Sequence, residues 1–194
     1  MEHFRQNVIT RVTLYGERER YSGYIERNVM QRTIDILNNP KTLERFFNEG
    51  CIPENNLLLK DAVVRTHGNE RNAYFLLVNL RHILFAFDEY SNNSEKCNLG
   101  DETESKRHHK RKGDPDIVRV VLGQDPLKHF IIQGKSYCFK HRGEKEEQKK
   151  FFPVTDAEIW YMTQERIQRI SEGISFVAVN KDAYKTLELV VKRA

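Results

Sequence analysis

Apolar and polar residues alternate in short runs along most of this chain, which is typical of half-buried β-strands. Residues 8–25 alternate around a charged tip, Gly16-Glu-Arg-Glu-Arg20, and predict two strands joined by a hairpin. Apolar runs at 57–66, 72–79 and 81–87 predict three more strands, with a turn at His67-Gly68-Asn69 between the first two. Similar runs recur later, at 117–122, 130–139, 152–159 and 176–180.

The apolar period changes between residues 28 and 38. Val29, Met30, Ile34 and Leu37 fall near helical spacing and predict a short helix that ends before Pro40. A second helical piece is expected after Pro40, with Leu43, Phe46 and Phe47 on one face and Gly50 as its stop. Residues 162–170 predict a further helical turn.

Residues 91–114 show no apolar period and are rich in Asn, Ser, Glu, Lys and His, which predicts a charged, mobile linker. Its first part is acidic, and its second part is a basic run over residues 106–112.

The segments on either side of this linker follow the same plan, which predicts an internal duplication. Three landmarks occur in the same order in both: a Gly in the second strand, an Asp-Ala pair, and a closing Val-Asn turn. They are Gly23 and Gly134, Asp61-Ala62 and Asp156-Ala157, and Val78-Asn79 and Val179-Asn180. We therefore expect a first β module over residues 1–90, a linker over 91–114, and a second β module over 115–194.

The phrases Phe151-Phe-Pro-Val-Thr-Asp-Ala157 and Phe176-Val-Ala-Val-Asn-Lys181 resemble those of small bacterial domains of unknown function that look like Sm-like barrels. Gln31-Arg-Thr-Ile-Asp-Ile-Leu-Asn38 resembles the short helical segment of the same family. The resemblance covers most of both modules. It implies a mainly β fold with minor α content: two tandem small antiparallel barrels or bent sheets, with a helical insertion in the first copy.

The wider Sm-like class includes RNA binders with a basic signature in the loop after the fourth strand. Asn79-Leu-Arg-His82 keeps a basic pair there, Arg81 and His82, whereas Asn180-Lys-Asp-Ala183 does not. The basic linker residues would contact phosphates by releasing counterions. They are Lys106, Arg107, Lys110, Arg111 and Lys112. Alternatively, this run is a solvated segment that offsets the acidic part of the linker.

The formal net charge of +4 is too small to indicate a polyanion partner by itself. Three widely spaced cysteines argue against a disulfide framework. The start of the sequence does not resemble a secretory signal, and no apolar run reaches the roughly 20 residues that span a bilayer. We therefore expect a cytoplasmic protein without a membrane segment.

Candidate reactive residues do not form a recognisable catalytic pattern. Cys138-x-x-His141, even with Cys97 and His108-His109, lacks a second spaced pair, so no metal site is predicted. Asp61 and Asp156 fit turns or side-chain bonds to the backbone better than an acid/base pair. Asn79 and Asn180 are interpreted as left-handed turn residues.

Phosphate-binding and nucleophile motifs are also absent, so we expect no cofactor and no enzymatic activity. The remaining aromatic group, Trp160-Tyr161-Met162, would either line a binding face or pack at the end of a strand.

These observations favour a non-enzymatic binding or scaffold protein that acts through protein–protein contacts, with a protein partner or self-association. The alternative is an RNA- or DNA-binding module that uses the basic linker together with Arg81 and His82.

Overall fold

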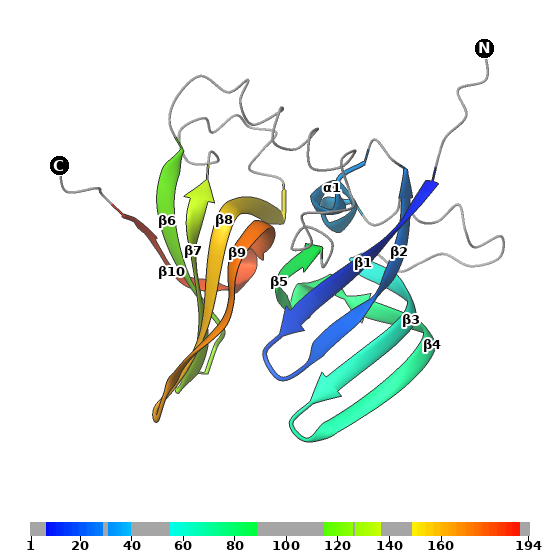
Figure 1. Ribbon diagram of the computed structural model, residues 1–194, viewed down its shortest axis with the longest axis horizontal. Helices are drawn as coiled ribbons and strands as arrows, with labels where there is room; N and C mark the ends of the chain where they lie inside the picture. The colour runs from blue at the N-terminus through cyan, green and yellow to red at the C-terminus, as the bar shows by residue number, and fades with distance from the viewer. Residues whose placement is uncertain are drawn as a thin grey trace, which may run out of the picture.

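The computed structural model of the chain describes residues 7–28, 31–39, 55–88, 115–125, 127–136 and 149–190. Within these residues, ten antiparallel strands form one sheet, accompanied by one short α-helix and two 3₁₀ turns (Figure 1). The prediction of a mainly β protein with minor α content is confirmed.

The first half of the structure, residues 7–88, contains five strands and the helix. Its elements are β1 (Asn7–Gly16), β2 (Arg20–Asn28), α1 (Thr33–Asn38), β3 (Asn56–Thr66), β4 (Asn69–Asn79), η2 (Leu80–His82) and β5 (Ile83–Asp88). The hairpin and the next two strands lie where the sequence predicts them. The strand expected from residue 81 begins later, because residues 80–82 form η2. The helical piece expected after Pro40 lies outside the described residues.

The second half, residues 115–190, contains the other five strands. They are β6 (Asp116–Leu122), β7 (Lys128–Ser136), β8 (Phe151–Thr163), β9 (Ile167–Asn180) and β10 (Tyr184–Leu189), with η4 (Lys181–Ala183) before the last. The helical turn expected over residues 162–170 is wrong. Met162 pairs with Ile167 across β8 and β9, and the Thr163 N–H donates to the Arg166 carbonyl at 2.9 Å, so a tight hairpin turn forms instead.

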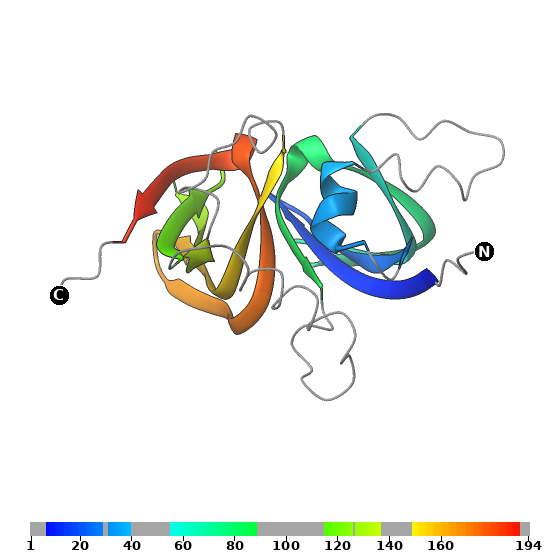
Figure 2. The ribbon, with the colours of Figure 1, turned by 90° about the horizontal axis from the view of Figure 1, so that it is seen from above.

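The strand order is β10-β6-β7-β8-β9-β5-β1-β2-β3-β4. Each half thus has its last strand beside its first, followed by its second, third and fourth. The halves join where β9 pairs with β5, with Phe85 opposite Val179 and Ala86 opposite Ala178. In Figure 2 the two curled halves stand side by side with β5 and β9 at their junction. The sheet is therefore continuous through both halves, with β4 and β10 at its two ends.

The third strand of each half bends at a β-bulge. In β3, Asp61 has φ 46°, and in β8, Asp156 has φ 50°. The register shifts opposite each, at Gly23 in β2 and at Gly134 in β7. A Cβ at Gly134 would lie 2.6 Å from the Thr155 carbonyl oxygen, so glycine allows the close approach that the bend requires.

The closing turns of the two halves are also alike. Asn79 caps η2 by accepting the Arg81 N–H, and Asn180 caps η4 by accepting the Asp182 N–H, each at 3.0 Å. Both asparagines have φ −75°, so the expectation of left-handed turn residues is wrong. Their role follows from the side-chain oxygen, which satisfies a backbone donor at the start of each turn.

Two hydrophobic clusters fill the halves, and each contains residues from the other half. Phe151, Phe176 and Ala178 of the second half pack in the cluster of the first. Conversely, the cluster of the second half contains residues of the first: Tyr15, Leu84, Phe85 and Phe87. The Tyr15 and Phe85 rings stack with centroids 4.6 Å apart. Neither core is complete without the other half.

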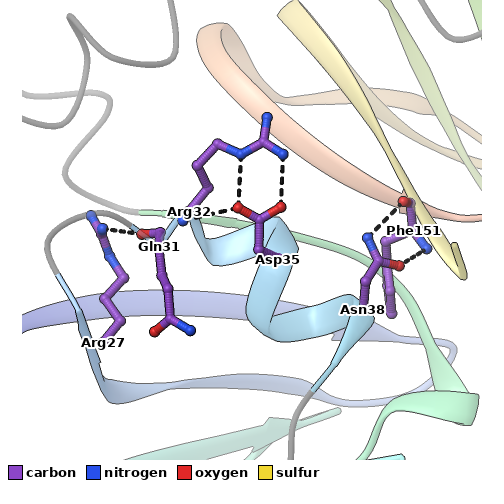
Figure 3. Close-up of polar contacts among 6 residues, drawn as sticks. All are labelled: Arg27, Gln31, Arg32, Asp35, Asn38 and Phe151. Atoms are coloured by element: carbon purple, nitrogen blue, oxygen red, sulfur yellow. Dashed lines mark hydrogen bonds and ion pairs between the residues drawn. The ribbon is translucent and has the colours of Figure 1, made fainter. Parts of the chain in front are cut away.

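Helix α1 reinforces this junction (Figure 3). The Asn38 side-chain amide donates to the Phe151 carbonyl at 3.1 Å, and its oxygen accepts the Phe151 N–H at 2.7 Å. A side-chain amide thereby pairs with the backbone of β8 as a neighbouring strand would. At the other end of the helix, Asp35 accepts from the guanidinium of Arg32 at 2.7 and 2.9 Å. The helix is short, so these contacts at its two ends hold it in place.

Candidate functional site

Arg81 and His82, the described part of the predicted basic site, both lie exposed in η2. The cap from Asn79 holds their turn, and the His82 carbonyl lies close to Gly16 at the end of β1. The predicted linker residues lie outside the described part of the chain: Lys106, Arg107, Lys110, Arg111 and Lys112.

A cleft of about 580 Å³ opens between η2, η4 and the loop that joins β1 to β2. Its charged lining residues come from both halves, and they include both acidic and basic side chains. These residues are Glu17, Arg18, Glu19, Arg81, His82, Asp182 and Lys185. The structure thus brings Arg81 and His82 together with charged residues of the second half.

Several acidic groups of the cleft have their own hydrogen-bond donors. Glu17 accepts the Gln124 N–H at 2.7 Å, which links the two halves across the cleft. The Tyr21 hydroxyl donates to Glu19, and burial, followed by that carboxylate, raises the pKa of Tyr21.

Nearby, the pKa of Lys150 is lowered, first by burial and also by the positive charge of Arg81, although Asp182 opposes this. Side chains of both charges therefore line the cleft. Phosphate binding favours uncompensated positive charge, so the cleft offers a mixed surface rather than a basic one.

The end of the sheet at β4 differs from the cleft because it is apolar. Tyr74, Phe75 and Leu77 are 75%, 48% and 50% exposed, and we call these three side chains the β4 patch. The Tyr74 and Phe75 rings contact each other edge to face, with centroids 4.6 Å apart. No charged residue interrupts residues 73–78, the part of β4 that contains the patch. An edge strand of this kind is a surface on which another strand can pair.

The other residues singled out in the sequence lie apart from both features. Asp61 and Asp156 stand in bulges of β3 and β8, and four strands separate these two strands in the sheet. The Lys135 ammonium lies 2.8 Å from the Asp156 carboxylate. Both aspartates thus shape the backbone.

Trp160, Tyr161 and Met162 are half-buried, and the Tyr161 ring packs 4.9 Å from that of Phe130, as expected of packing at a strand end.

Among the described residues, no group of three or more His, Cys, Asp or Glu side chains is placed to hold a metal ion. Cys97, Cys138 and His141 lie outside this part of the chain. No helix in the described ranges is long and apolar enough to cross a membrane.

The sequence does not single out the β4 patch, because the run of residues 74–78 is apolar on both faces of the strand. Nor does it reveal the second role of Asn180. This side chain is fully buried, and its amide donates to the Ile83 carbonyl of the other half at 2.6 Å. An Asn in a turn gives no signal of such a contact.

Comparison of the chain with protein-family models, with curated proteins and with solved structures finds no match.

Proposed function

We propose that this chain is a non-enzymatic binding or scaffold protein that contacts a protein partner along the outer edge of β4, the last strand of the sheet among the described residues. The observation that carries the proposal is the β4 patch, in which three large apolar side chains stand exposed on the strand that ends the sheet. Partners recognise such edges by adding a strand: backbone hydrogen bonds supply affinity, and alternate side chains supply specificity.

The composition of β4 supports this proposal. Natural sheets block unwanted pairing with charges, prolines or bulges on their outer strands. The charged residues of β4, Glu70 and Arg71, lie near its beginning. Glu70 forms an ion pair with Arg65 of β3, with 2.5 Å between the Arg65 Nε and the Glu70 Oε2. Among the described strands, none pairs with the outer edge of β4.

We further propose that the two halves are diverged copies of one Sm-like barrel module, with α1 as an insertion in the first copy. The common strand order, the Gly and Asp of each bulge, and the Asn cap of each closing turn support this origin. A cytoplasmic location remains a prediction from the sequence.

The proposed function is tested with a β4 variant that carries Phe75→Lys and Leu77→Lys. Both side chains are about half exposed, so the substitutions place charge on the edge with little loss from the core. The control is Ile167→Lys, which charges an apolar residue that is 65% exposed in the hairpin between β8 and β9.

Each immobilised protein is exposed to an extract, and a protein retained by wild type is purified and added back. We expect wild type and the control to bind it and the β4 variant to lose it, with slowed amide exchange over residues 73–78 in the complex. Equal binding by all three proteins would exclude the β4 edge as the binding surface.

The nucleic-acid alternative is examined by titrating labelled single-stranded RNA and duplex DNA at low and at physiological salt. Since the cleft has mixed charge, we expect no binding that survives physiological salt. Salt-sensitive binding that persists there would move this alternative ahead of a protein partner.

A further inference from the structure

The junction between the halves shows how an edge like β4 is covered. β9 has the same place in the second half as β4 has in the first: it follows the bulged strand and precedes an Asn-capped turn. On β9, Phe176 and Ala178 are buried, because β5 pairs along its outer edge and both side chains enter the cluster of the first half.

The corresponding residues of β4 are exposed. Counting back from the asparagine caps, Phe75 matches Phe176 and Leu77 matches Ala178. Phe176 is 5% exposed and Ala178 is fully buried, whereas Phe75 and Leu77 are 48% and 50% exposed. The neighbours differ, since β9 has β5 beside it whereas no described strand lies beyond β4.

The strand at the opposite end, β10, matches β5 in the same way. Both begin after the 3₁₀ turn and pair with the first strand of their half, but β10 has no neighbour on its other side among the described strands. Ala86 of β5 matches Leu187, which is partly buried against the second cluster, and Asp88 matches Leu189, which is 54% exposed. Among the described strands, the sheet thus ends in one strand of each type.

The register of the internal contact defines how these two ends would meet. Ala178 lies opposite Ala86 in the junction. The same register brings Leu77 of one molecule opposite Leu187 of another, and Phe75 opposite Leu189. On this face of the pair, apolar residues therefore lie opposite apolar residues.

We propose that β4 pairs with β10 of a second copy of this chain, antiparallel and in the register of the β9–β5 junction. This inference rests on the proposed function, since it names the partner of the β4 edge. The contact is heterologous, so it extends head to tail and gives a closed ring or an open chain of molecules.

The intermolecular contact is weaker than the internal one. β5 contributes the apolar side chains of Phe85 and Phe87 to the junction, whereas the matching positions of β10 are Thr186 and Glu188, both exposed. Polar residues on an edge limit uncontrolled pairing. Association is therefore reversible and depends on concentration.

The first measurement is sedimentation velocity of the wild-type chain from about 10 µM to about 1 mM, the range in which weak interfaces associate. We expect the average mass to rise with concentration.

The decisive test uses two singly blocked proteins. The first is the β4 variant defined above, and the second carries Leu189→Lys on β10. Each blocks one end and leaves the other intact, so each alone is monomeric. An equimolar mixture forms a 1:1 heterodimer, because the intact β10 of one meets the intact β4 of the other.

Ile167→Lys associates like wild type, and matching near-UV circular dichroism shows that all variants are folded.

Three outcomes would overturn the inference. If Leu189→Lys still associates while the β4 variant does not, two β4 edges meet each other instead. If both variants associate like wild type, the contact lies elsewhere. If wild type stays monomeric but the β4 variant alone loses a bound foreign protein, the proposed function holds and the partner is not a second copy.

Discussion

Asn79 and Asn180 show how one residue type at matched positions has different roles. Both side chains cap a 3₁₀ turn in the same way. Only Asn180 is buried, and only Asn180 donates across the junction to the Ile83 carbonyl. The neighbouring strands, not the local sequence, determine whether the side-chain amide nitrogen of the asparagine has a hydrogen-bond acceptor.

We predict that Asn180→Ala destabilises the protein more than Asn79→Ala. Both variants lose a cap, but only Asn180→Ala also leaves a buried carbonyl without its donor, which costs about 1–3 kcal/mol more. Urea unfolding of the two variants and wild type measures this difference. Equal losses would mean that the bond across the junction contributes nothing.

Gly134 and Gly23 lie opposite the two β-bulges, and we predict that they tolerate alanine differently. Gly134→Ala places a Cβ 2.6 Å from a backbone oxygen, whereas at Gly23 the nearest atoms lie farther away, Leu59 Cβ at 3.0 Å and the Lys60 carbonyl oxygen at 3.1 Å. The steric overlap is therefore deeper at Gly134, and we expect a loss of about 1–3 kcal/mol for Gly134→Ala. The loss for Gly23→Ala should be smaller, and thermal unfolding of both tests the order.

Among the elements, α1 is held at both ends by side chains rather than by its length. The carboxylate of Asp35 forms an ion pair with the guanidinium of Arg32, and the side chain of Asn38 hydrogen-bonds to the backbone of β8. Burial tends to raise the pKa of Asp35, but the hydrogen bond and the charge of Arg32 outweigh it and lower that pKa.

The lowered pKa of Asp35 predicts that the stabilisation by the Asp35–Arg32 ion pair depends on pH. A carboxyl with a lowered pKa in the folded protein contributes stability above its unfolded pKa of about 3.9, and the contribution disappears as the pH falls through the folded value. We expect the stability difference between wild type and Asp35→Asn to narrow below about pH 4.

The matched control is Arg32→Met, which removes the guanidinium and should weaken the same pH dependence, since the Arg32 backbone N–H and Lys149 remain. If Asp35→Asn and wild type lose stability in parallel down to pH 2, the ion pair does not stabilise the helix. Urea unfolding at several pH values distinguishes these results.

The strands themselves follow from the apolar pattern, as the agreement over residues 8–25, 57–66 and 117–122 shows. The pairing of strands distant in sequence does not. Phe75 and Phe176 have similar local contexts, a Phe four residues before an Asn at the end of an apolar strand. One is exposed and the other buried because β5 lies beside β9. Neither the candidate edge nor the cleft around Arg81 is visible before the sheet is assembled.

At the scale of the whole molecule, each half supplies residues to the core of the other. Aromatic side chains of β5 complete the second cluster, and Phe151 and Phe176 complete the first. Separating the halves would expose these residues. One core therefore cannot unfold without removing part of the other.

We predict that damage to the first core is detected by a probe in the second half. Leu59 is fully buried in the first cluster, and Leu59→Ala should cost about 2–5 kcal/mol. Trp160 in β8 is the single tryptophan of the chain, so its fluorescence reports the second half. The unfolding midpoint seen by this tryptophan should fall in Leu59→Ala and stay unchanged in Ile9→Ala, whose side chain is 71% exposed.

If the tryptophan transition of Leu59→Ala matched that of wild type while circular dichroism showed an earlier step, the halves would unfold independently.

The junction also imposes an order on synthesis. Asn180 and its partner Ile83 are 97 residues apart in the chain. At about 5–20 residues per second, the ribosome needs on the order of 5–20 s to make the segment between them. During that time Phe85 and Phe87 have emerged but their partners in the second half do not yet exist. The nascent first half therefore exposes the apolar edge of β5, which chaperones can recognise until β9 is made and pairs with it.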